Sequence, residues 1–242
     1  MRALIAPAAL AVAALGCAPR PRPPEVPDVS QGEWSLSRER LAEVRKEQPE
    51  RPYVERVKIS IRDPRTNKAY EGRGAVAVSP ERAARLIMIG PGGTTALDVW
   101  VTPDRFRFVV PAIHFERRGG TDPEESRGLP IGMLRWWFLS PLSGRLLMAR
   151  SSKAESAFLL REGTATVLVR TDGAHFLAVR RQGENVEGIE WLGAGLAPAA
   201  GARGRYMEGK LGLQVDVLVE DVMDREPDPA AFLDPDKGDT SL

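Results

Sequence analysis

The segment Leu211–Glu220 (LGLQVDVLVE), near the C-terminus, decides the fold class because its side chains alternate in polarity. Apolar residues occupy every second position from Leu213 to Val219, passing through Val215 and Val217. The positions between them include Gln214, Asp216 and Glu220. A period of two residues places one set of side chains on each face of a β-strand. The segment therefore predicts a strand with one buried face and one solvated face.

Segments of the same kind recur upstream at short intervals. Turn residues such as Asp63-Pro64 and Pro91-Gly92-Gly93 separate them. We expect strands at 57–61, 70–78, 85–89, 95–101, 105–110, 157–160, 165–170, 175–180, 186–191, 205–210 and 211–220. About ten or eleven short strands with regular turns predict a mainly β fold, either a curved antiparallel sheet or an incomplete β-barrel.

Two segments interrupt this pattern and predict helices. Ser35–Glu47 has apolar residues at helical spacing and is followed by prolines, which predicts an N-terminal helix. Gly128–Pro141 (GLPIGMLRWWFLSP) is a dense apolar block in which Pro130 suits a helix start and Pro141 a helix end. Its two adjacent tryptophans point about 100° apart on a helix, so one can plug a core while the other lies at a rim. The block is either a core helix packed on the sheet or a short helical lid over an apolar cavity.

Two of these segments carry a resemblance to a known family. Gly128, Leu129, Pro130, Leu134 and Trp137 follow a G-x-x-L-P-x-x-x-L-x-x-W pattern with slightly altered spacing, and 90–98 contains a P-x-G turn between two strands. With the order of helix, strands, helical insert and strands, residues 35–222 resemble the LolA/LolB superfamily of periplasmic lipoprotein carriers and acceptors, LolB more closely. The resemblance implies an incomplete β-barrel that holds acyl chains, with short helices closing its mouth.

The resemblance also implies a ligand site, because an acyl chain needs a continuous apolar concavity. We expect that cavity to be lined by Leu97, Val99, Phe106, Phe108, Met133, Trp136, Trp137, Val215 and Val217. The same residues also fit an ordinary core, since strand alternation alone produces an apolar face. LolB-type proteins carry an apolar residue, often Leu, at the tip of the P-x-G loop, where it is implicated in passing lipoprotein into the membrane. Gly92 stands there in this chain, so this loop has no side chain to insert.

The N-terminus predicts export and lipid attachment. Arg2 precedes an apolar run, Ala3–Leu15, which is shorter than the roughly 20 residues of a membrane-spanning helix. Ala14-Leu15-Gly16-Cys17 resembles a lipobox, the bacterial site at which lipid is attached to the thiol before cleavage. Cys17 is the single cysteine of the chain, so it has no disulfide partner, although an ordinary signal peptide with a chance cysteine also fits. Several acyl chains on Cys17 would give a stable membrane anchor.

These features divide the chain into four parts. We expect a signal peptide at 1–16, a lipidated Cys17 with a proline-rich tether at 17–31, a LolB-like barrel at 32–222 and a polar, disordered tail at 223–242. Ala18, directly after the cysteine, is not Asp, which by resemblance to enterobacterial sorting rules favours the outer membrane. The expected location is therefore the outer membrane, facing the periplasm.

Charge and motifs restrict the function further. Without residues 1–16 the chain has 33 basic and 33 acidic residues and no dominant basic patch, so we expect no nucleic-acid partner. It has two histidines and no H-E-x-x-H, G-x-S-x-G or Walker A motif, so we expect no enzymatic activity, no metal site and no cofactor. Two functions remain. The first is an acceptor or carrier for acyl chains of lipid or lipoprotein, and the second is a structural or assembly lipoprotein that docks an envelope protein.

Overall fold

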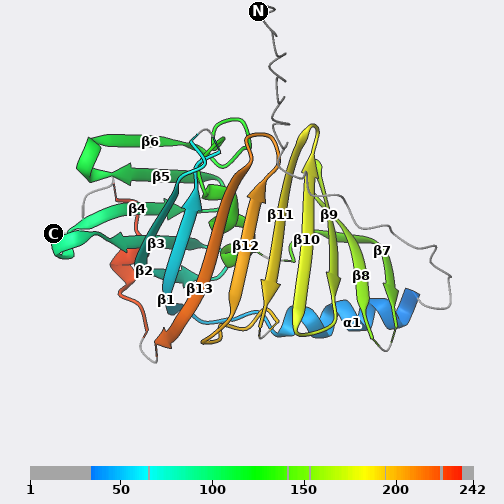
Figure 1. Ribbon diagram of the computed structural model, residues 1–242. Helices are drawn as coiled ribbons and strands as arrows, with labels where there is room; N and C mark the ends of the chain where they lie inside the picture. The colour runs from blue at the N-terminus through cyan, green and yellow to red at the C-terminus, as the bar shows by residue number, and fades with distance from the viewer. Residues whose placement is uncertain are drawn as a thin grey trace, which may run out of the picture.

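An antiparallel sheet of 13 strands forms the body of the protein (Figure 1). The structure is a computed structural model and describes residues 34–64, 66–140, 142–152, 154–193, 195–223 and 226–235. The strands are β1 (Tyr53–Arg62), β2 (Ala69–Ser79), β3 (Ala83–Ile89), β4 (Thr95–Val101), β5 (Arg105–Val110), β6 (Phe115–Gly120), β7 (Arg145–Ser151), β8 (Ser156–Glu162), β9 (Ala165–Thr171), β10 (His175–Gln182), β11 (Asn185–Leu192), β12 (Arg203–Glu208) and β13 (Leu213–Met223).

The sheet consists of two meanders that meet where β1 pairs with β13. One runs from β1 to β6 and the other from β13 back to β7, so β6 and β7 are the two edges. Val57 of β1 pairs with Val219 of β13, and Ile59 pairs with Val217, which places their apolar side chains on one face. The sheet is curved but not closed, which confirms the predicted mainly β fold with an incomplete barrel.

The N-terminal helix α1 (Trp34–Lys46) lies across one end of β7 and β8 (Figure 1). Leu41 and Val44 are buried, as their helical spacing predicts for a helix that covers a sheet with one face. Within the described ranges, no helix is both long and apolar enough to cross a membrane.

The apolar block forms a π-helix, η4 (Met133–Leu139), which is buried on almost all sides. Six of its seven residues are buried, and Arg135 is half-buried. It contacts β2 and β3 in one meander, and the ring of its Trp137 contacts aromatic rings of β10 and β11 in the other. A helix that is apolar all round belongs inside a core. The insert therefore lies within the curve of the sheet and fills its concave side.

Two strands at the edges of the sheet were not expected from the sequence. β6 has the sequence FERRGG and is largely exposed, so it lacks the alternation of a half-buried strand. β7 contains an irregularity between Leu146 and Met148 that shifts its pairing with β8 and interrupts the period of two. The strand expected at 205–210 instead runs from Arg203 to Glu208, and a turn follows it.

Part of the expected C-terminal tail is also ordered. The short 3₁₀ helix η5 (Pro229–Phe232) packs against β2 and β3. The indole Nε1 of Trp100 donates a hydrogen bond to the carbonyl oxygen of Phe232 at 3.2 Å. This short helix within the expected tail therefore packs against the sheet.

Candidate functional site

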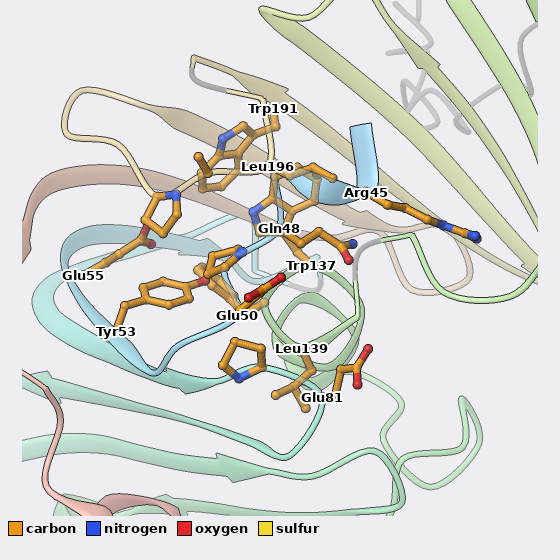
Figure 2. A pocket seen from close by; sticks show the side chains of 15 residues that line it. Arg45, Gln48, Glu50, Tyr53, Glu55, Glu81, Trp137, Leu139, Trp191 and Leu196 are labelled. Atoms are coloured by element: carbon orange, nitrogen blue, oxygen red, sulfur yellow. The ribbon is translucent and has the colours of Figure 1, made fainter. Parts of the chain in front are cut away.

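A pocket of about 360 Å³ opens beside the C-terminal half of the π-helix (Figure 2). Its wall includes the connection from α1 to β1, the first residues of β1, the β2–β3 turn, residues 137–139 and the loop at 196–198. The pocket thus lies where the helical insert meets the rim of the sheet. Its volume falls within the range of small-molecule sites.

Aromatic rings form the apolar side of this pocket. The ring centroid of Trp137 lies 4.7 Å from that of Trp191 and 5.3 Å from that of Phe176. Phe138 meets Trp191 edge to face at 6.4 Å. Such pairs add to the free energy gained by burial. They attach the π-helix to β10 and β11 while exposing ring surface to the pocket.

Glu55 brings a carboxyl group into this apolar wall. It lies on the inner face of β1 between Tyr53 and Val57, opposite Val76 of β2 and Val222 of β13. The residue is only 2% exposed, and its Oε2 has no hydrogen-bond partner among the described residues. Burial raises the pKa of Glu55 from 4.5 to about 7. This carboxyl group therefore changes its charge near neutral pH.

Sequence reasoning missed Glu55 because it began the first strand at Val57. Tyr53 and Glu55 continue the same period of two as Val57 and Ile59, and β1 in fact begins at Tyr53. A charged residue in phase with an apolar row was the signal that could have found it.

Few polar contacts hold the C-terminal end of the π-helix at the rim. The backbone N–H of Glu81 donates to the carbonyl oxygen of Leu139 at 3.1 Å. Arg45 donates to the carbonyl oxygen of Leu142 from Nε and Nη2, at 3.1 and 2.9 Å, and to that of Gly144 at 2.7 Å. Figure 2 shows the guanidinium group of Arg45 directed away from the centre of the pocket. Its charge is thus used to hold the segment that follows the helix.

A second buried polar cluster, the Arg180 network, lies on the other side of the π-helix. Arg180 donates to Glu162 at 2.8 Å and to Glu187 at 3.3 Å, and the hydroxyl of Tyr206 donates to Glu187 at 2.8 Å. Arg135 of the π-helix reaches Glu162 at 3.4 Å. Burial acts to raise the pKa of Glu162, but Arg180 and Arg135 outweigh it and lower that pKa. In contrast to Glu55, each carboxylate here has a cationic partner.

The nine residues expected to line an acyl cavity are all buried in one hydrophobic core cluster. They come from the π-helix and from the inner faces of three strands, namely Met133, Trp136 and Trp137 of η4, Leu97 and Val99 of β4, Phe106 and Phe108 of β5, and Val215 and Val217 of β13. Trp137 lines the pocket, and the others pack in the core. Trp136 thus lies in the core and Trp137 at the rim. The assignment of this set to an acyl cavity stays a prediction.

The remaining expected features lie at the surface or outside the described residues. Gly92 is exposed at the tip of the β3–β4 turn, where its φ of +77° favours glycine and a Cβ would meet no atom within 4 Å. Cys17, the signal peptide and the tether lie outside the described residues. Among the residues that are described, no three of His, Cys, Asp and Glu are grouped to hold a metal ion.

Solved structures of other proteins share this fold. No protein-family model matches the chain, and no curated protein matches it in sequence. A LolA superfamily protein from Nitrosomonas europaea superimposes with a TM-score of 0.52 at 13% identity, covering 82% of this chain and 98% of that one. A candidate outer membrane lipoprotein-sorting protein domain from Vibrio parahaemolyticus gives 0.45 at 11% identity, covering 82% and 96%. A DUF1329 family protein from Desulfovibrio piger gives 0.44 at 9% identity, covering 83% and 97%. With its open antiparallel barrel and its apolar helical insert, the chain has a LolA/LolB-like fold.

Proposed function

We propose that this protein is a membrane-anchored bacterial lipoprotein whose barrel binds acyl chains of lipid or lipoprotein. The observation that carries the proposal is the π-helix, which is apolar on almost all sides and fills the concave face beside an aromatic pocket. The backbone N–H of Glu81 holds its C-terminal end at the rim, and Arg45 holds the segment that follows the helix. Displacing this end would open an apolar surface to a ligand without breaking a strand of the sheet.

In this proposal, the packing of the insert against the sheet is the closed form of the barrel. Phe108 and Val217 of the sheet, like Trp136 of the insert, are buried in the same cluster. An acyl chain that enters from the pocket would replace the contacts that the insert makes with the sheet, so the apolar face of the sheet stays buried in both forms. The apolar side chains of the displaced insert oppose this exchange, which would favour release of the ligand.

The proposal places the protein in the cell envelope, tethered through lipid on Cys17 to the outer membrane and facing the periplasm. The proline-rich segment before residue 32 would act as a semi-rigid spacer between anchor and barrel. Gly92 distinguishes this protein from a LolB-type acceptor, because its loop tip offers no side chain to the bilayer. We therefore propose binding of acyl chains as the primary activity, without insertion through this loop.

Lipid that co-purifies with the protein tests the proposal. The full chain carrying Cys17→Ser, purified without detergent, is extracted for mass spectrometry and titrated with a fluorescent fatty acid. We expect bound lipid in this protein and its loss in Trp137→Asp and Phe108→Asp, because a charge in the apolar wall repels an acyl chain. Leu36→Asp is the matched control, since Leu36 is 66% exposed on α1. Circular dichroism separates loss of binding from unfolding. A folded protein that carries no lipid and does not bind the fatty acid would contradict the proposal.

A second candidate function is docking of an envelope protein, and exposed apolar residues favour it. Ile113 is 70% exposed on the β5–β6 turn, and Phe115 is 40% exposed at the start of the edge strand β6. An exposed edge strand with apolar side chains is a common protein-binding surface. Crosslinking to an envelope protein in the periplasm that is abolished by Ile113→Asp, with lipid binding unchanged, would support docking at this edge.

A further inference from the structure

Glu55 is an unexplained charge in an apolar row. The inner face of β1 runs through Tyr53, Glu55, Val57 and Ile59, and Glu55 is among the largest fully buried side chains of the protein. Its Oε2 has no hydrogen-bond partner in the described part of the chain. Leaving a buried polar group without a partner costs about 1–3 kcal/mol, and more for a charge. Folding alone therefore gives no reason for a carboxyl group at this position.

Glu55 faces the pocket beside the π-helix. Glu55 is one of its lining residues, and the rings of Tyr53, Trp137 and Trp191 line the same pocket (Figure 2). The faces of aromatic rings carry negative charge and attract cations, most strongly where water is excluded. A buried carboxyl group next to such rings is the arrangement that binds an organic ammonium ion.

Two further acidic side chains line the pocket. Glu50, on the connection from α1, and Glu81, in the β2–β3 turn, also line it. Arg45 is the single cation among the lining residues, and its guanidinium group is bound to the carbonyl oxygens of Leu142 and Gly144. The pocket therefore favours a positive ligand group over a carboxylate or a phosphate.

We propose that this pocket binds the ammonium head of an amine-bearing amphiphile. Glu55 would be its counter-ion, and the rings of Trp137 and Trp191 would contact it. The proposal rests on the proposed function only for the aliphatic part of the ligand, which would extend from the pocket under the π-helix. The ammonium group is the head group that the pocket would select.

Binding of this kind depends on the charge of Glu55. Burial raises the pKa of Glu55 to about 7, so the group is half protonated at neutral pH in the empty protein. An ammonium ion binds the ionised form and releases the proton. The charged or titratable groups that face the pocket are Tyr53 on β1, Glu50 and Arg45 before β1, and Glu81 in the β2–β3 turn. Burial, and then the charge of Glu55, raise the pKa of Tyr53 well above 10, so it stays neutral here. We expect the affinity for the amine to rise about tenfold from pH 6 to pH 8.

Three ligands of equal chain length test the proposal: decylamine, decanol and decanoate, with propylamine as the head group alone. Each is titrated by calorimetry at pH 8, below its micellar concentration, into the full chain carrying Cys17→Ser. We expect decylamine to bind at least tenfold more tightly than decanol and decanoate. Glu55→Gln should remove this preference while decanol binding is kept. Glu184→Gln is the control, because Glu184 is exposed in the β10–β11 turn.

The outcomes separate the two proposals. Equal binding of all three decyl compounds, unaffected by Glu55→Gln, would overturn the ammonium site and leave the acyl-binding function standing. Binding of propylamine that depends on Glu55, without binding of any decyl compound, would support the ammonium site and overturn the acyl-binding function. A folded protein that binds none of the four compounds would overturn both. Because Gln has nearly the same shape as Glu, a thermal midpoint for Glu55→Gln at or above that of the parent protein would show that the variant folds.

Discussion

Glu55 and Glu187 are two carboxyl groups buried to a similar depth in one barrel, 2% and 7% exposed, but their surroundings differ. Glu187 accepts hydrogen bonds from Arg180 and from the hydroxyl of Tyr206. Oε2 of Glu55 has no such partner among the described residues, and the residue lines a pocket. The paired carboxylate belongs to a network that supports the N-terminal side of the π-helix. The unpaired one marks the place where the fold accepts a cost that a ligand can remove.

Removing Arg180 from the network of paired charges around Glu187 should have the largest effect on stability. Arg180→Met would leave Glu187 with the Tyr206 hydroxyl, and Glu162 with Arg135 and the side chain of Ser143. Removing one partner of a buried ion pair costs about 3–5 kcal/mol, because the other charge stays buried. We expect a loss of this size in the free energy of unfolding, measured with urea at pH 7. Arg181→Met is the matched control, since Arg181 is exposed on the same strand. A loss below about 1 kcal/mol for Arg180→Met would show that the network does not stabilise the fold.

The unpaired carboxyl group of Glu55 should make the free energy of unfolding depend on pH. The pKa of Glu55 is about 7 in the folded protein, against an ordinary value of 4.5. A raised pKa means that the folded state binds the proton more tightly, so the contribution of Glu55 is present below pH 4.5 and is lost as the pH rises through 7. At about 1.4 kcal/mol per pKa unit, the loss amounts to about 3 kcal/mol.

Urea unfolding of the parent protein and of Glu55→Gln at pH 5 and pH 8 measures this effect. The parent protein should lose about 2.5 kcal/mol more than the variant over this range, and Glu184→Gln should behave like the parent. Identical pH dependence in the parent and in Glu55→Gln would mean that the carboxyl group is not desolvated.

The contrast between the two regions also explains how far the sequence predicts the structure. β13 was predicted because one face is buried and the other solvated, so Val215 and Val217 alternate with polar residues. β6 was missed because both faces of this edge strand are largely exposed, and no alternation remains to be seen. The period of two therefore reports burial on one face rather than strand geometry itself.

The candidate site was predicted only in part, for a related reason. Trp137 was found because it belongs to a dense apolar block, whereas Glu55 is a single polar residue whose neighbours in space come from β2, β11 and the π-helix. The partners of Arg180 are nearer in the chain, because Glu187 faces Arg180 across the β10–β11 hairpin and Glu162 lies on β8. The surroundings of Glu55 come instead from segments that are far apart in the chain, and no local pattern contains that information.

Adding a methyl group at Gly132 tests whether the network around Glu187 has free space. A Cβ on Gly132, just before the π-helix, would overlap Oε1 of Glu187 and the hydroxyl of Tyr206. These two atoms are bound to each other, so neither can move away freely. We expect Gly132→Ala to cost about 2 kcal/mol, as overpacking of a filled core does. Urea unfolding at pH 7 measures the loss, and a stability equal to that of the parent would show that the helix start can shift to make room.

The smallest effect should come from the hydroxyl of Tyr206. Tyr206→Phe removes one neutral donor from Glu187 but leaves its bond to Arg180, so we expect a loss of about 1 kcal/mol in the free energy of unfolding. Tyr70→Phe is the control, since Tyr70 is 58% exposed. The hydroxyl is also one of the two atoms that a methyl group on residue 132 would meet. The double variant Gly132→Ala with Tyr206→Phe should therefore lose less than the sum of the two single losses, by about 1 kcal/mol. If the two losses in the free energy of unfolding are strictly additive, the strain of Gly132→Ala falls on Glu187 alone. The carboxylate rather than the hydroxyl would then limit how closely the π-helix packs.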